Sequence, residues 1–181
     1  FEEAAEAGDL ESQIKCAKIF YEGEDGIKID KTKSAHYYAM AAYKDDVDAM
    51  YQYGKMLYEG DGVDINKSKA AEYFKQASSY DHVDSMFIYA QILYNGDGIE
   101  ENKREAAEYY RQAAKKGNVE AMYQYSLMHQ IADGIYPIKK EASKYCKMAA
   151  DNGHVKAMLL YAEKLLNGDE ETVDKKESAR Y

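Results

Sequence analysis

The sequence of 181 residues contains little that would interrupt or cross-link a helical chain. It has one proline, no tryptophan and only two cysteines, Cys16 and Cys146. Because proline lacks a backbone donor and ends helices, its near absence favours an all-helical fold. Two cysteines cannot form the dense disulfide framework of a small secreted domain. No apolar run approaches the roughly 20 residues that span a bilayer, so we expect no membrane insertion.

Positive charge is also scarce. Lys and Arg number 24 against 33 Asp and Glu, which gives a net charge of −9 and a pI near 5.0. Proteins that bind nucleic acid or anionic membrane surfaces need clustered basic residues, so both classes of partner are excluded. The surplus of acid lies in the N-terminal half. A basic partner segment could dock there, and the solubility of a long exposed surface explains the same surplus.

Aromatic content is concentrated in tyrosine, with 19 Tyr against 4 Phe, and the chain repeats internally. An element ending in Val-x-(Ala/Ser)-Met recurs every 36 residues, at 45–50, 81–86, 117–122 and 153–158. A related element at residues 8–13 lies 37 residues before the first of these. We therefore predict a single repeat array over residues 1–181. Residues 1–7 end a preceding helix, repeats one to four are 8–44, 45–80, 81–116 and 117–152, and 153–181 is a truncated fifth repeat.

One repeat predicts two helices, which we call helix A and helix B. In repeat two, apolar residues at helical spacing predict helix A over Val47–Glu59, and Gly60 should end it in a left-handed conformation. Asn66 should cap helix B, which runs from Lys67 to about Ser79. The same cap register holds Asp30, Asn102 and Asp174. A helix pair this short cannot bury both faces alone, so we predict an all-α fold, an α/α superhelical solenoid of about five helix–turn–helix repeats.

The third repeat carries a recognisable pattern of small, glycine and tyrosine positions. These are Ala90, Gly96, Gly98, Ala106, Tyr109, Tyr110, Ala113, Ala114 and Gly117. The pattern resembles the Sel-one-like repeats, relatives of the tetratricopeptide repeats, and the likeness covers essentially the whole chain. The resemblance implies an α/α superhelix with helix A on its concave surface. It also implies an adaptor role, because family members assemble protein complexes. Phe1 and Tyr181 both fall inside helix B registers, and the sequence leaves open whether the array continues at either end.

Two ladders of aromatic residues follow helix A from repeat to repeat, one through Tyr51 and the other through Tyr58. With their variable neighbours they form the candidate partner-binding surface: Tyr51, Lys55, Tyr58, Phe87, Gln91, Tyr94, Tyr123 and Leu127. Exposed aromatic anchors on a concave wall suit a peptide or a partner helix. The alternative is that the rings pack between adjacent repeats.

Repeats four and five depart from their sisters. Repeat four has Ala132 in place of the first turn glycine, His129 at a leucine register and Ile138 at the cap register, and repeat five has Glu170 in place of the second glycine. We expect the loops between their helices to differ from the others.

Sequence signals for chemistry are weak. His82 and His154 share a register but lie two repeats apart, too far to bind one metal ion. Ser12 and Lys15 have the Ser-x-x-Lys spacing of penicillin-binding enzymes but lack the companion motifs. We therefore predict no catalysis, no metal and no cofactor.

The sequence predicts a protein–protein interaction scaffold that binds an unidentified protein or peptide on the concave helix A surface. One alternative is an architectural spacer that self-associates end to end through its exposed half-repeats. Another is a regulatory segment of a larger enzyme. We place the chain in the cytoplasm, with the lumen of the endoplasmic reticulum as the alternative.

Overall fold

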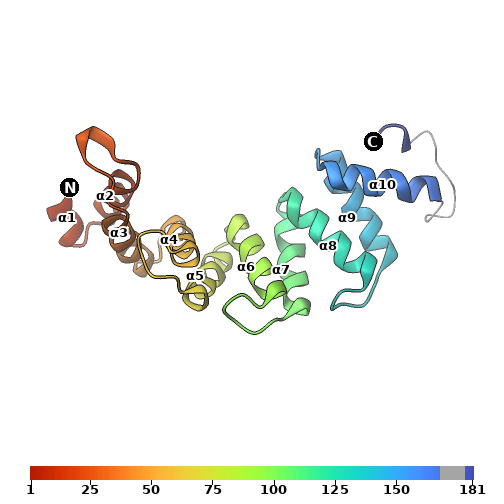
Figure 1. Ribbon diagram of the computed structural model, residues 1–181, viewed down its shortest axis with the longest axis horizontal. Helices are drawn as coiled ribbons and strands as arrows, with labels where there is room; N and C mark the ends of the chain where they lie inside the picture. The colour runs from red at the N-terminus through yellow and green to blue at the C-terminus, as the bar shows by residue number, and fades with distance from the viewer. Residues whose placement is uncertain (168–177) are drawn as a thin grey trace. The chain divides into compact units, whose positions relative to one another are not determined.

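A computed structural model describes residues 1–167 and 178–181, and this part of the chain is all-helical, without strands (Figure 1). Asp174 and Glu170 lie outside the described residues. A short 3-10 helix, Glu24–Gly26, follows the second helix. The α-helices are α1 (Glu2–Glu6), α2 (Leu10–Glu22), α3 (Lys31–Tyr43), α4 (Val47–Glu59), α5 (Lys67–Ser79), α6 (Val83–Asn95), α7 (Lys103–Lys115), α8 (Val119–Ile131), α9 (Lys139–Asp151) and α10 (Val155–Asn167).

The chain forms two compact units, Phe1–Glu101 and Asn102–Tyr181. In the first unit, α1 to α6 pack in chain order, each against the helix before and after it. In the second unit, α7 to α10 pack in the same sequential manner. The predicted class of stacked helix pairs is confirmed within each unit. That residues 1–181 form a single array stays a prediction.

The predicted helix boundaries of repeat two are confirmed. Helix A is α4, Val47–Glu59, and Gly60 follows it with φ +77°, in the left-handed region. Helix B is α5, Lys67–Ser79, and the Asn66 side-chain oxygen accepts a hydrogen bond from the backbone N–H of Lys69 at 3.0 Å. The equivalent cap in α7 is made by Asn102. Local residues therefore decide where these helices begin and end.

Small residues and methionines fill the core. At one register of helix A, Gly54, Ala90 and Ser126 are all buried. A Cβ atom on Gly54 would lie 3.1 Å from the ring of Phe74, so the helices approach closely at this register. The methionines that end the repeated element, Met50, Met86 and Met122, are buried as well. They fill the core and offer no adaptable surface.

The loop of repeat four differs from its sisters, as the sequence predicts. Ala132 ends α8 in the left-handed conformation with φ +55°, where sister repeats use glycine. Ile138 precedes α9 without a side-chain capping bond. This loop also places Tyr136 in the solvent, 85% exposed. Across residues 1–167 and 178–181, no helix has both the length and the apolarity that crossing a bilayer requires.

Candidate functional site

A polar contact joins the turn of one repeat to the repeat before it. In the first unit, Asp97 lies in the Gly-Asp-Gly turn after α6. Its carboxylate accepts hydrogen bonds from the Tyr58 hydroxyl and from Lys67 Nζ, the latter at 2.7 Å. One repeat earlier, Asp61 accepts from Tyr21 at 3.1 Å and pairs with Lys31 at 2.7 Å. We call this arrangement the Tyr–Lys–Asp contact.

The second unit repeats the lysine part of the Tyr–Lys–Asp contact. Lys103 Nζ lies 2.8 Å from the Asp133 carboxylate, with the same separation of 30 residues. At Asp97, where both Tyr58 and Lys67 donate hydrogen bonds, the acceptor is a charged carboxylate. The bond to Asp97 and burial raise the pKa of Tyr58 to about 12. The hydrogen bonds from Lys67 and Tyr58 lower the pKa of Asp97. The Tyr58 hydroxyl, in the predicted partner surface, is thus engaged within the scaffold.

The second glycine of each turn lets the turn lie against the preceding repeat. A Cβ atom on Gly98, which has φ +82°, would lie 2.5 Å from Lys67 Cβ and 2.9 Å from the Lys67 carbonyl carbon. A Cβ atom on Gly62 would lie 2.4 Å from the backbone of Lys31. The close approach brings Asp61 and Asp97 within reach of their lysines, and no other residue type fits without movement.

The first aromatic ladder packs against the residue that caps the next helix A. The Tyr51 ring lies 4.8 Å from the ring of His82 and 6.1 Å from that of Phe74. In the second unit, Tyr123 stacks on His154 at 4.3 Å. Burial raises the pKa of both tyrosine hydroxyls. Both rings pack between adjacent repeats and stay half-buried, so each keeps part of its surface open to solvent.

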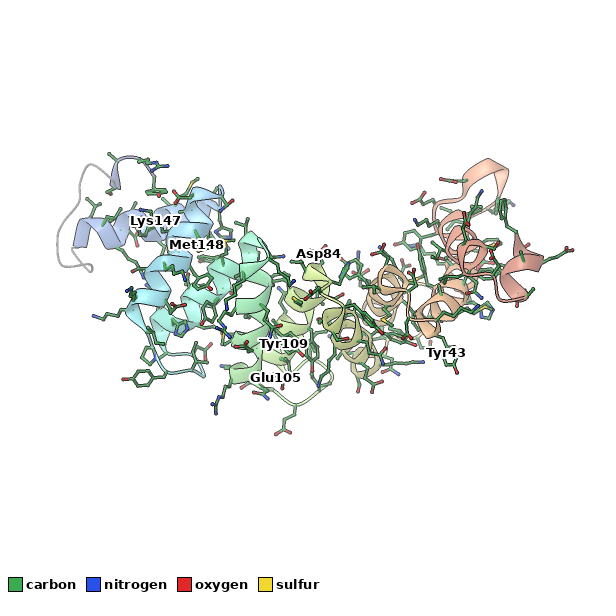
Figure 2. All side chains as sticks on the ribbon, turned by 180° about the vertical axis from the view of Figure 1, so that it is seen from behind. Tyr43, Asp84, Glu105, Tyr109, Lys147 and Met148 are labelled. Atoms are coloured by element: carbon green, nitrogen blue, oxygen red, sulfur yellow. The ribbon has the colours of Figure 1, made fainter. Side chains whose placement is uncertain are left out.

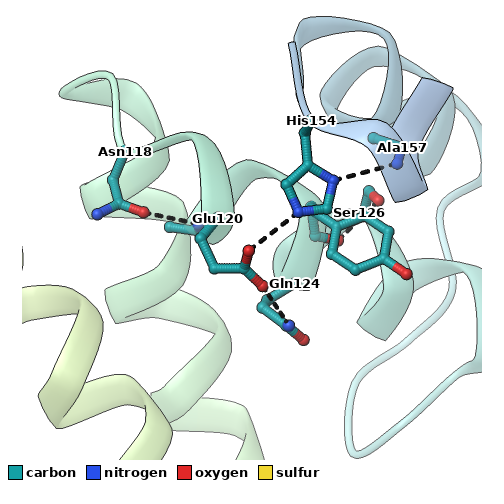
Figure 3. A network of polar contacts seen from close by, with 8 residues as sticks. Asn118, Glu120, Gln124, Ser126, His154 and Ala157 are labelled. Atoms are coloured by element: carbon teal, nitrogen blue, oxygen red, sulfur yellow. Dashed lines mark hydrogen bonds and ion pairs between the residues drawn. The ribbon is translucent and has the colours of Figure 1, made fainter. Parts of the chain in front are cut away.

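Figure 3 shows the network around His154 in the second unit. His154 Nδ1 accepts a hydrogen bond from the backbone N–H of Ala157 at 3.1 Å, and Nε2 donates to the Glu120 carboxylate at 2.9 Å. Burial raises the pKa of Glu120, but hydrogen bonds from Gln124 and His154 outweigh it and leave the pKa below its ordinary value. The network holds the Tyr123 ring between two repeats.

The His154 network has a looser counterpart in the first unit. His82 Nδ1 accepts from the backbone N–H of Ser85, and Nε2 lies 3.8 Å from the Asp48 carboxylate. Asp84 occupies the register of Asp48 one repeat later and is exposed at the start of α6 (Figure 2). From the sequence, these histidines are considered only as metal ligands that lie too far apart, and their capping role is not predicted. The cap register, which holds Asp9, Asp46 and Asn118 elsewhere, carries the missing signal.

The eight residues of the candidate partner surface share one state: each is half-buried. At the register that varies between repeats, Lys55 places its ammonium group 5.8 Å from the Tyr51 ring centroid. Gln91 and Leu127 occupy the same register in the next two repeats. None of the eight side chains is fully buried in the core, and none is fully exposed to solvent. Whether they bind a partner stays a prediction.

The residues that the sequence analysis considered as metal ligands or catalytic groups do not form a common site in the described part of the chain. Within the described part of the chain, no three His, Cys, Asp or Glu side chains lie close enough to hold a metal ion. Ser12 is buried, as a small packing residue would be. Cys16 and Cys146 are free and buried.

A family model for the Sel1 repeat matches four segments of the chain, residues 10–46, 47–79, 83–118 and 119–154. The chain belongs to the Sel1 repeat family, and the resemblance read from its glycine and tyrosine pattern is confirmed. No curated protein matches the chain.

Solved structures share the fold at low sequence identity. A protective antigen of uropathogenic Escherichia coli with an SLR fold is 22% identical, with a TM-score of 0.88, over 97% of this chain and 38% of that one. A Sel1 repeat protein from Oxalobacter formigenes is 22% identical, with a TM-score of 0.80, over 96% and 70%. Helicobacter pylori cysteine rich protein B is 20% identical, with a TM-score of 0.52, over 62% and 88%. The chain thus spans well under half the length of the first of these.

Proposed function

We propose that the chain is a protein-interaction scaffold that binds a segment of a partner protein along helix A. The observation that carries this proposal is the shared half-buried state of the eight candidate residues. A ring whose inner face is fixed by a neighbouring repeat loses little conformational entropy when a partner covers its outer face. Large aromatic side chains held in this way are the usual anchors of protein interfaces.

The variation along the array supports the same surface. Registers that pack repeats together keep similar residues, such as Met50, Met86 and Met122. Lys55, Gln91 and Leu127 share a register yet differ in charge, polarity and size. The scaffold does not dictate this register, so it is suited to distinguishing one partner from another.

A peptide-display selection against residues 1–181 provides ligands for the test. Binding of a selected peptide should weaken about tenfold or more when Lys55 and Gln91 are both replaced by alanine, because each loses a contact and neither supports the core. Lys115→Ala, at the exposed end of helix B in α7, is the matched control and should leave binding unchanged. Circular dichroism verifies the fold. Unchanged affinity in the folded double variant would contradict the proposed surface.

The ladder rings test the alternative. Tyr51, Phe87 and Tyr123 replaced together by alanine should abolish peptide binding in a chain that remains helical. Unfolding without selective loss of binding would assign the rings to packing between repeats alone.

Two alternatives from the sequence remain predictions. An architectural module that stacks end to end should grow in mass with concentration, which light scattering measures. A regulatory segment of a larger enzyme would be recognised from a longer sequence. Location in the cytoplasm also stays a prediction.

A further inference from the structure

Three polar side chains of the second unit occupy registers that other repeats fill with buried apolar residues. They are His129 in α8, Ser143 in α9 and Lys164 in α10. The sister residues are Leu57 and Leu93 at the register of His129, Ala71 and Ala107 at that of Ser143, and Met56, Ile92 and Met128 at that of Lys164. Packing does not require these replacements, since the same registers are filled by apolar side chains elsewhere in the array.

All three replacements line one pocket of about 470 Å³, formed by α8, α9, α10 and the loop of repeat four. Ile131, Pro137 and Ala142 supply apolar wall. The size and the mixture of apolar wall with a few converging polar groups are typical of small-ligand sites.

His129 presents an acceptor to this pocket. Its side chain is 6% exposed. Nδ1 lies 3.2 Å from the backbone carbonyl oxygen of Tyr136, which can only accept, so Nδ1 carries the proton. In the neutral ring, Nε2 then carries a lone pair. This buried Nε2 has no hydrogen-bond partner among the described residues. A ligand donor that reached this nitrogen, with a small shift of the side chains around it, would supply the missing bond.

Lys164 presents a cation. The residue is 8% exposed and lines the pocket. Within residues 1–167 and 178–181, no carboxylate forms an ion pair with Lys164. A second lysine, Lys139, lines the same pocket and is exposed. The pocket therefore offers positive charge for an anion, an acceptor at His129 and an apolar wall beside them.

We propose that this pocket binds an N-acylated amino acid with an apolar side chain. Its carboxylate would pair with Lys164, its amide N–H would donate to His129 Nε2, and its side chain would lie against Ile131 and Pro137. This chemistry has two sources, a free N-acyl amino acid and the C-terminal residue of a peptide. None of the eight residues of the candidate partner surface lines this pocket, so either proposal can fail without the other.

Nuclear magnetic resonance titration of residues 1–181 tests the proposal with four probes. N-acetyl-leucine and an acetylated peptide with uncharged side chains and a free C-terminal leucine carboxylate should both shift the resonances of His129, Ser143 and Lys164 and saturate. N-acetyl-leucine amide lacks the carboxylate, and 4-methylpentanoate lacks the amide. Each should bind about tenfold or more weakly than N-acetyl-leucine. If the peptide binds at least about tenfold tighter than N-acetyl-leucine, the source is a peptide terminus, and equal affinities indicate the free compound.

Variants that restore the sister residues provide the matched test. Lys164→Met and His129→Leu should each weaken N-acetyl-leucine binding about tenfold or more, with a thermal midpoint equal to or above that of the parent. Lys156→Met removes an exposed positive charge from the same helix and should leave binding unchanged. Absence of saturable binding to the parent overturns the proposal, and so does equal binding of the four probes. Unchanged affinity in both folded sister-residue variants overturns it as well.

Discussion

Replacing Gly98 by alanine should destabilise the first unit more than the same change at Gly26. The two glycines have almost the same backbone conformation, with φ +82° and +81°. A Cβ atom on Gly26 would meet nothing within 4 Å, whereas one on Gly98 would lie 2.5 Å from Lys67 Cβ and 2.9 Å from backbone atoms. Both alanine variants thus incur the cost of a left-handed alanine. Only the variant at Gly98 also disturbs the close approach between repeats.

The expected magnitudes follow from these two contributions. A left-handed alanine costs about 1–2 kcal/mol, and this should be the whole loss of unfolding free energy in Gly26→Ala. Forcing an extra carbon atom into a packed contact costs about 1–3 kcal/mol more, which applies only to Gly98→Ala. The contact distances in that variant involve the backbone of Lys67, which cannot rotate away as a side-chain end could. Gly98→Ala should therefore lose the Tyr–Lys–Asp contact at Asp97 as well.

Urea unfolding followed by circular dichroism measures both variants of residues 1–181. Because both substitutions lie in the first unit, unfolding in more than one step affects them alike. If the two variants lose the same unfolding free energy to within about 0.5 kcal/mol, the close approach has no energetic role and the reasoning fails.

Further predictions concern the Tyr–Lys–Asp contact and the loop of repeat four. Asp97→Asn should lower the unfolding free energy by about 1 kcal/mol at neutral pH. Because folding lowers the pKa of Asp97, this stabilisation is complete above the unfolded value of about 3.9 and is lost as pH falls through the folded value. Urea titrations of parent and variant at neutral and acidic pH should therefore converge in acid. Nuclear magnetic resonance titration, which resolves the Tyr58 ring from the other tyrosines, should show its pKa, about 12 in the parent, falling in the same variant. Ala132→Gly should raise the unfolding free energy by about 0.5–1 kcal/mol by relieving a left-handed alanine. Ile138→Asn should raise it by about 1 kcal/mol by supplying the missing cap of α9. Thermal or urea unfolding checks both, and a decrease in either would contradict the assigned loop geometry.

Helix boundaries are predictable from this sequence because their determinants are local. Gly60 ends α4 through its own backbone conformation, and Asn66 caps α5 through a bond to an N–H three residues away. The Tyr–Lys–Asp contact is not local, since Lys67 and Asp97 are 30 residues apart. Its sequence signal is the recurrence of lysine and aspartate at fixed registers in consecutive repeats. That recurrence shows neither which residues meet nor that a glycine brings them together.

The pocket of the second unit was only partly visible in the sequence. His129 stands out as a polar residue at a leucine register. Ser143 and Lys164 stand out only when their own registers are compared with Ala107 and Met128. Even then, their convergence depends on how α8, α9 and α10 pack. The 36-residue periodicity predicts that these helices are neighbours, but it does not predict a pocket between them.

The Tyr–Lys–Asp contact has a consequence for how such chains change length. The lysines that begin α3, α5 and α7 each meet an aspartate 30 residues later, and the pairing of Lys31 with Asp61 is chemically the same as that of Lys67 with Asp97. A duplication or deletion of one 36-residue period within residues 31–133 therefore rejoins a matching donor and acceptor. Whole repeats can therefore be gained or lost during evolution without new substitutions at the contact between the repeats that are joined.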